Sequence, residues 1–360
     1  MTPRTGRLTA IAAALSVMGI LLAVYLVART PRDVLGGLGD EPAAVTPRGP
    51  QVQYTLEPGR SAAQVGRDLE QLGVVASGRR FELLVSLMGV QDRLGAGDFV
   101  FHKNSATVGV VNQFIVQDAV PVLRVTFQEG LRIEEMAELA RDAGFGTRTQ
   151  FLEAAAAATL PLELAANLPA GANLQGYLFP DTYIMPVGST PAQLVALMIK
   201  TFDRRFSPEL RAAALARGLN THQAVTLAAV VEREAAKEDE RPLIAGVFYN
   251  RLKASDRLGA DPTVQFAAAL SPASVEKYGW WKKELTIDDL ENTSKYNTRL
   301  FPGLPPGPIA CPGLASIEAV ARPAETDYYY FVADAKKGDG SHVFAVTFAE
   351  HDRNIARYGQ

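Results

Sequence analysis

The stretch from Leu174 to Tyr183, Leu-Gln-Gly-Tyr-Leu-Phe-Pro-Asp-Thr-Tyr, has the side chains best suited to contact a flat ligand. Gly176 is a poor helix former and Pro180 lacks a backbone donor, so the stretch is not a regular helix. We interpret it as a loop or strand edge that presents side chains at a groove. An aromatic turn that fills the core is the alternative, since most loops carry no site. The side chains available for ligand contact are Tyr177, Phe179, Asp181 and Tyr183.

Two carboxylates lie near the end of a helix that is predicted to begin at Thr221. Glu232 and Glu234 are two positions apart, so on a helix they point in quite different directions. One of them can therefore face a groove while the other is solvated. A charged helix end with ordinary ion pairs is the simpler interpretation.

The tripeptide Asp261-Pro262-Thr263 is predicted to form a turn. Its carboxylate and hydroxyl could cap a helix that starts near Pro262, because proline is favoured in the first turn of a helix. Capping is the expected role of Asp261, and a position at the groove is the alternative.

Proline and glycine alternate between Gly303 and Gly313, which favours an extended and rigid backbone. Such a segment could form the wall of a groove for a sugar strand. Just before it, Tyr296 offers a ring for stacking and Asn297 offers amide hydrogen bonds. A rigid surface loop that covers the core is the alternative interpretation.

These candidate residues belong to a predicted mixed α+β domain that starts near Pro121 and occupies residues 121–360. The alternation of residues 122–127 predicts a strand, and residues 328–333 and 342–345 predict a hairpin. Helical spacing predicts helices over 191–206, 208–217 and 221–251, and a final helix that Thr347 caps.

A smaller module is predicted over residues 51–120. Residues 52–56 and 97–101 have the pattern of strands, and residues 81–88 that of a helix. Ser61 could cap a helix that continues through Leu72. The predicted order is therefore strand, helix, helix, strand, with a short helix after it from Thr107.

The N-terminus contains an uncharged, apolar run from Leu8 to Ala28, long enough to cross a bilayer core of about 30 Å. The run is long for a signal peptide and has no convincing cleavage site before Arg29. We expect residues 1–7 to form a cytoplasmic tail, 8–28 a single transmembrane helix and 29–50 a Gly/Pro-rich linker. The remainder would lie outside the cytoplasmic or inner membrane.

The composition argues against several classes of function. The chain has 360 residues, a net charge of −3 and no basic stripe interleaved with aromatic residues, so nucleic acid is not an expected partner. The single cysteine, Cys311, allows no intramolecular disulfide, and the four histidines lack ligand spacing. We expect neither a metal site nor a cofactor.

The Leu174–Tyr183 stretch resembles the signature of the YceG-like (MltG) family of endolytic murein transglycosylases. That signature reads roughly Leu-Glu-Gly-aromatic-x-aromatic-Pro-Asp-Thr-aromatic. The resemblance continues in the same order over most of the chain after residue 50. The further matching blocks are 230–241, 250–252, 261–264, 296–313 and 328–344.

The resemblance implies an α+β fold in which a small LysM-like module precedes the catalytic domain. In our alignment the catalytic glutamate of the family falls on position 175, where this chain has Gln175. Gln175 is then either an engineered Glu→Gln change or a natural loss of the acid. The substrate-binding residues that the resemblance implies are Tyr177, Phe179, Asp181, Tyr183, Glu232, Glu234, Asn250, Asp261, Thr263, Tyr296 and Asn297.

The activity implied by the resemblance is cleavage of the β-1,4 bond between MurNAc and GlcNAc in peptidoglycan glycan strands. One glutamic acid would first act as acid and then as base, leaving a 1,6-anhydroMurNAc end. An amide cannot exchange protons at useful pH, so Gln175 predicts an impaired enzyme. The alternative is a non-catalytic glycan-binding scaffold, and penicillin-binding proteins are plausible partners for either.

Overall fold

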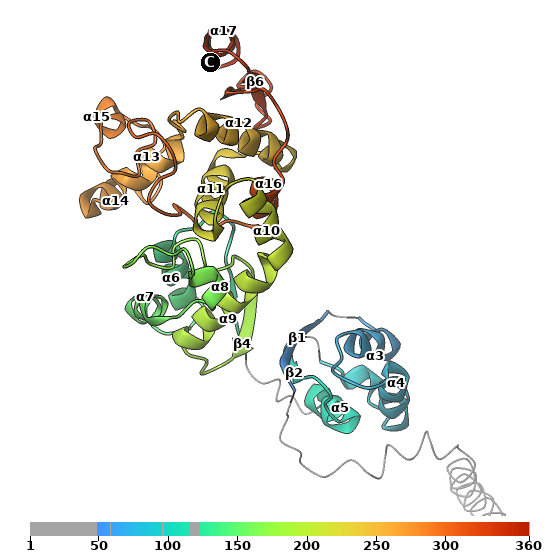
Figure 1. Ribbon diagram of the computed structural model, residues 1–360. Coiled ribbons are helices and arrows are strands. Elements are labelled where there is room, and N and C mark those ends of the chain that lie inside the picture. Colours follow the sequence, from blue (N-terminus) through green and yellow to red (C-terminus); the bar gives the residue numbers. More distant parts are fainter. Residues whose placement is uncertain (1–48, 58, 96, 116–121, 360) are drawn as a thin grey trace, which may run out of the picture. The chain divides into compact units, whose positions relative to one another are not determined.

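The computed structural model describes residues 49–57, 59–95, 97–115 and 122–359. The chain divides into two compact units, Met1–Ala119 and Val120–Gln360, which are drawn in Figure 1. The predicted cytoplasmic tail and transmembrane helix, and the linker up to residue 48, lie outside the described residues. Within the part that is described, no helix is both long and apolar enough to cross a membrane.

The first unit is a two-stranded antiparallel sheet covered by helices, in the predicted order. Strands β1 and β2 pair from Gln51 opposite His102 to Leu56 opposite Gly97. Ser61 caps α3 through a capping box with Gln64, as predicted. Its LysM-like character stays a prediction. The elements are β1 (Gln51–Leu56), α3 (Ala62–Gln71), α4 (Gly78–Leu87), a 3₁₀ turn (Gln91–Arg93), β2 (Gly97–His102) and α5 (Thr107–Ile115).

The second unit contains two separate antiparallel strand pairs and a larger set of helices, so the predicted mixed architecture is confirmed. Strands β3 and β4 pair from Val122 opposite Pro186 to Thr126 opposite Thr182. Strands β5 and β6 form the predicted hairpin. The strands are β3 (Val122–Thr126), β4 (Thr182–Pro186), β5 (Tyr330–Ala333) and β6 (His342–Ala345).

The helices of this unit begin and end close to the predicted positions, and Thr347 caps the final helix as expected. They are α6 (Ile133–Asp142), α7 (Arg148–Ala157), α8 (Leu162–Ala165), α9 (Pro191–Arg205), α10 (Pro208–Ala216), α11 (Thr221–Glu234), α12 (Arg241–Lys253), α13 (Asp261–Ala268), α14 (Pro272–Tyr278), α15 (Ile287–Leu290), α16 (Leu314–Ala321) and α17 (Phe348–Tyr358), with a 3₁₀ turn at Glu238–Glu240.

Helix α11 lies at the centre of the second unit. Every residue from Ala224 to Val231 is buried, as expected for a helix that is apolar on all sides. It packs against α10, α12, α13 and α16, and Figure 1 shows it among α10, α12 and α16. Asn220 caps its first turn with Gln223 in a capping box. The apolar run stops at Glu232, so the two predicted carboxylates emerge where this buried helix ends.

The start of α13 differs from the prediction. The helix begins at Asp261, its N-cap is Ala260, and no side chain caps it. The Asp261 carboxylate instead accepts a hydrogen bond of 2.6 Å from Arg299 Nε. The Thr263 hydroxyl donates backwards to the Ala260 carbonyl at 2.6 Å. The capping role expected for Asp261 is therefore wrong, because an ion pair occupies its carboxylate.

Gly176 is predicted to be intolerant of alanine. Its φ of +89° costs an L-residue about 1–2 kcal/mol. An added Cβ would also lie 2.5 Å from Pro308 Cβ and 2.9 Å from Val225 Cγ1. Such overpacking costs about 1–3 kcal/mol more.

Gly188 provides the matched control, because its φ is +91° but no atom lies within 4 Å of an added Cβ. We expect urea unfolding to show a larger loss of stability for Gly176→Ala than for Gly188→Ala. Equal losses would contradict the close packing at Gly176.

Candidate functional site

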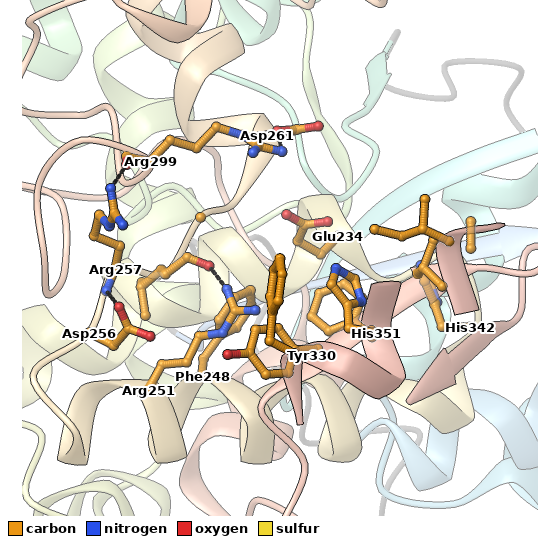
Figure 2. A pocket seen from close by; sticks show the side chains of 17 residues that line it. Glu234, Phe248, Arg251, Asp256, Arg257, Asp261, Arg299, Tyr330, His342 and His351 are labelled. Carbon is orange, nitrogen blue, oxygen red and sulfur yellow. Dashed lines mark hydrogen bonds and ion pairs between the residues drawn. The ribbon is translucent and has the colours of Figure 1, made fainter. Parts of the chain in front are cut away.

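A pocket of about 700 Å³ lies in the second unit beside the C-terminal end of α11. We call it the Glu234 pocket, and Figure 2 shows the side chains around it. Acidic, basic and aromatic side chains from helices α11, α12 and α13, the β5–β6 hairpin and α17 meet here. The lining residues are Glu234, Phe248, Arg251, Asp256, Arg257, Leu258, Gly259, Asp261, Arg299, Tyr330, Phe331, Val332, Ala333, His342, Phe348, His351 and Ile355.

The carboxyl group of Glu234 has an unusual acidity. Burial raises its pKa to about 8, and the negative charge of Asp261 acts in the same direction. Arg299 and Arg251 lower the pKa by a smaller amount, as does a hydrogen bond from the Asp261 backbone N–H. Glu234 is also the last residue of α11, where the helix dipole disfavours a negative charge. At neutral pH this group therefore holds its proton and can donate it.

The ion pair between Asp261 and Arg299 fixes one side of the pocket. Arg299 Nε donates to Asp261 Oδ1 at 2.6 Å. Because Asp261 is the first residue of α13, the same residue brings its backbone N–H to Glu234. A carboxylate formed on Glu234 thus faces a helix N-terminus, which stabilises negative charge.

Arg251 holds the floor of the pocket. Its Nε donates to the Tyr329 carbonyl at 2.6 Å, and its Nη1 donates to the Leu258 carbonyl. Its guanidinium lies 5.1 Å from the centre of the Tyr330 ring. Burial lowers the pKa of Arg251, but arginine remains charged at physiological pH.

The hairpin and α17 supply an aromatic and histidine wall. The His351 ring stacks on Tyr330 with 5.1 Å between ring centres. Burial lowers the pKa of His351, and the charge of Arg251 adds to this effect. His342 Nδ1 lies 2.7 Å from Glu240 Oε2, so Glu240 orients that ring.

Glu232 points away from the Glu234 pocket, which confirms that the two glutamates leave α11 in different directions. Its Oε1 lies 3.3 Å from Arg241 Nη2, and its Oε2 accepts from the Gly313 N–H at 3.0 Å. It is therefore buried in an ion pair and is not solvated, as was predicted for the glutamate facing away from the groove. Glu129 lies nearby, and burial, together with the charge of Glu232, raises its pKa.

Gln175 is buried, with 4% of its surface exposed, and is not among the residues that line the Glu234 pocket. Its Oε1 accepts a hydrogen bond of 3.0 Å from the Ile133 N–H, at the first turn of α6. It thereby satisfies one of the donors that every helix leaves free at its N-terminus. This environment is that of a helix-capping group, whereas the sequence suggested the position of the acid.

The aromatic residues of the 174–183 stretch belong to the core, which corrects the expectation that they face a groove. Tyr177 is fully buried, and its hydroxyl lies 2.9 Å from His222 Nδ1. Phe179 and Tyr183 are also buried, and the Tyr183 hydroxyl donates to the Phe179 carbonyl at 2.7 Å. Asp181 lies 3.4 Å from Arg205 Nη2, outside the Glu234 pocket.

Three of the four remaining predicted residues are held in structural contacts. Asn250 Nδ2 donates to the carbonyls of residues 326 and 328 at 2.7 and 2.9 Å. Thr263 and Asn297 are fully buried, and Asn297 Nδ2 donates to two backbone carbonyls. The half-buried Tyr296 ring packs 4.6 Å from Phe266. Of the predicted site residues, only Glu234 and Asp261 line the pocket.

Several pocket residues had no place in the sequence prediction. Arg251, Arg257 and Arg299 come from two segments that are far apart in sequence, and Tyr330 and His351 come from a third. The blocks 250–252 and 328–344 were noted in the sequence, but nothing in them indicated which side chains converge. Among the residues in the described part of the chain, no group of three His, Cys, Asp or Glu could hold a metal ion.

Glu234→Gln is predicted to change how stability depends on pH. The pKa is raised from 4.5 to about 8 in the folded state, so the native chain binds more protons than the unfolded chain between these values. The free energy of unfolding then falls as pH rises through this window, by at most about 1.4 kcal/mol per pH unit. The amide of the variant does not titrate, so urea unfolding at a series of pH values should show a shallower fall.

Glu284→Gln is the control for this measurement, because Glu284 is an exposed glutamate outside the pocket. Its curve should run parallel to that of the unchanged chain. A parallel curve for Glu234→Gln would contradict the raised pKa.

Comparison with known proteins gives a consistent result. A sequence profile of the YceG-like family matches residues 54–357. The endolytic murein transglycosylase of Bacillus subtilis (strain 168) is 29% identical over 322 residues, which cover 85% of this chain and 84% of that protein. The protein of the same name from Streptococcus pneumoniae serotype 2 (strain D39 / NCTC 7466) is 28% identical over 329 residues, covering 85% and 58%.

The fold is also similar to that of a solved structure. A 2.6 Å crystal structure of a YceG-like protein from Listeria monocytogenes aligns with a TM-score of 0.55 and 26% identity. The alignment covers 85% of this chain and 99% of that one. Since the family profile spans both compact units and the fold agrees, the chain belongs to the YceG-like family.

Proposed function

We propose that this chain is an endolytic peptidoglycan lytic transglycosylase. It would cleave MurNAc–GlcNAc β-1,4 bonds in nascent glycan strands and leave 1,6-anhydroMurNAc ends. Membership of the YceG-like family and the names of its relatives support this class of reaction. The observation that carries the proposal is a carboxyl group, Glu234, that keeps its proton at neutral pH in an open pocket.

Glu234 would act twice in one turnover. As an acid it gives its proton to the glycosidic oxygen while the bond from that oxygen to C1 of MurNAc breaks. Arg299, Arg251 and the Asp261 N–H stabilise the carboxylate that remains. As a base it then takes the proton of the C6 hydroxyl while the C6 oxygen bonds to C1. The proton is thus restored and no water is consumed.

The predicted impairment by Gln175 depends on that position being the acid. Its burial against α6 and its hydrogen bond to Ile133 N–H favour a structural role instead. We therefore place the acid at Glu234 and expect the chain to be active. The impairment stays a prediction, which cleavage assays on variants of both positions decide.

The location and partners of the protein follow from the sequence alone. We infer a single-pass anchor at residues 8–28 in the inner or plasma membrane, with both compact units outside the cytoplasm. A LysM-like role for the first unit and an association with penicillin-binding synthases belong to the same proposal. Both would keep the enzyme close to newly made strands.

The test compares Glu234→Gln, Glu232→Gln and Gln175→Glu with the unchanged full-length chain in detergent. Each protein is incubated with uncrosslinked glycan strands, and mass spectrometry detects 1,6-anhydro ends. We expect the unchanged chain to cleave, and Glu234→Gln to lose about 10²–10⁴-fold in rate. Gln175→Glu should change the rate little, because its carboxylate would still accept from Ile133 N–H.

Other outcomes would redirect the assignment. Cleavage that appears only with Gln175→Glu would return the acid to position 175. Cleavage abolished by Glu232→Gln but not by Glu234→Gln would move it to the Glu232 ion pair. Reducing ends in place of anhydro ends would indicate hydrolysis, with Asp261 as the second carboxylate. Binding without cleavage by any variant would favour the non-catalytic scaffold.

A further inference from the structure

The Glu234 pocket contains an arginine that has no carboxylate partner. Arg257 is exposed and lines the pocket, and it forms no ion pair with any carboxylate in the described part of the chain. Its Nη1 donates to the Arg299 carbonyl at 3.1 Å, which fixes the guanidinium at the pocket rim. Figure 2 shows Arg257 and Arg299 on the side away from His342.

The charges around the pocket do not balance at neutral pH. Three guanidinium groups line it, from Arg251, Arg257 and Arg299, together with the carboxylates of Asp256 and Asp261. Glu234 adds no charge while its pKa is about 8. The pocket therefore carries a surplus positive charge, which attracts an anionic group.

The opposite wall is apolar and open to solvent. Phe348 is 65% exposed and Ile355 is 43% exposed, although both line the pocket. They lie one heptad apart on α17 and so share a face of that helix. A ligand that carries an anion on one side and apolar groups on the other would match both walls.

We propose that the pocket binds the branch on C3 of MurNAc, with Arg257 recognising a carboxylate of that branch. This inference rests on the proposed function, because it takes the glycan strand as the substrate. The branch leaves the same sugar ring whose C1 is attacked beside Glu234. It carries methyl groups for the Phe348 and Ile355 wall and, in a peptide-bearing strand, free carboxylates for Arg257.

The carboxylate could come from two sources with the same chemistry. In peptide-bearing strands it belongs to the stem peptide, and in strands stripped by an amidase it belongs to the lactyl group itself. Three substrates separate the sources: peptide-bearing strands, the same strands with their carboxylates converted to amides, and amidase-stripped strands.

The experiment measures kcat/KM of the full-length chain on the three substrates. We expect peptide-bearing strands to be cleaved about tenfold faster than amidated ones, since hydrogen bonds to charged groups contribute about 1.5–3 kcal/mol. Arg257→Gln should lose this preference. Arg322→Gln, which removes an exposed arginine from another part of the second unit, should keep it. A preference that extends to stripped strands would identify the lactyl carboxylate.

The outcomes separate this inference from the proposed function. Cleavage of peptide-bearing and amidated strands at equal rates, with stripped strands no better, would overturn it while leaving the transglycosylase assignment intact. If no substrate is cleaved, the affinities of fluorescently labelled strands replace the rates. A preference for free carboxylates that depends on Arg257 would then uphold the inference, and equal affinities would overturn it.

Discussion

A protonated carboxyl group at the end of a buried helix is the feature on which the site depends. Helix α11 is apolar throughout Ala224–Val231 and is surrounded by other helices, so its position is fixed by packing. Its last residue, Glu234, is carried into a partly desolvated position that would be unfavourable for an ion. The same packing that stabilises the unit therefore sets the acidity of this group.

The surroundings of Glu234 keep the ionised form accessible. Arg299, Arg251 and the N-terminus of α13 all favour a negative charge, whereas burial and Asp261 oppose it. A group that must give up a proton and then recover it needs such opposing influences of similar size. The Asp261–Arg299 pair contributes to both sides, because the carboxylate raises the pKa and the guanidinium lowers it.

Periodicity in the sequence predicted much of the frame. The start of α11, the divergence of Glu232 and Glu234, the β5–β6 hairpin and the Thr347 cap all follow from local pattern, and local pattern is what sequence resolves best. The capping role of Asp261 failed because its partner Arg299 is distant in sequence.

The site was predicted less well for a related reason. Tyr177 and Tyr183 have the composition of a sugar-binding loop and also that of a buried aromatic turn, and only tertiary packing separates the two. The amide of Gln175 likewise gives no sign in sequence that its oxygen meets Ile133 N–H. The arginines of the pocket converge through contacts between α12, α13 and the loops beside them, which no spacing pattern encodes.

Infrared difference titration of the full-length chain tests the central claim most directly. Subtracting the Glu234→Gln spectrum isolates the carbonyl band of the protonated Glu234 carboxyl group. We predict that this band is present at neutral pH and disappears with a midpoint near pH 8. A midpoint near the ordinary value of 4.5 would show that Glu234 is ionised at neutral pH, and would contradict its assignment as the proton donor.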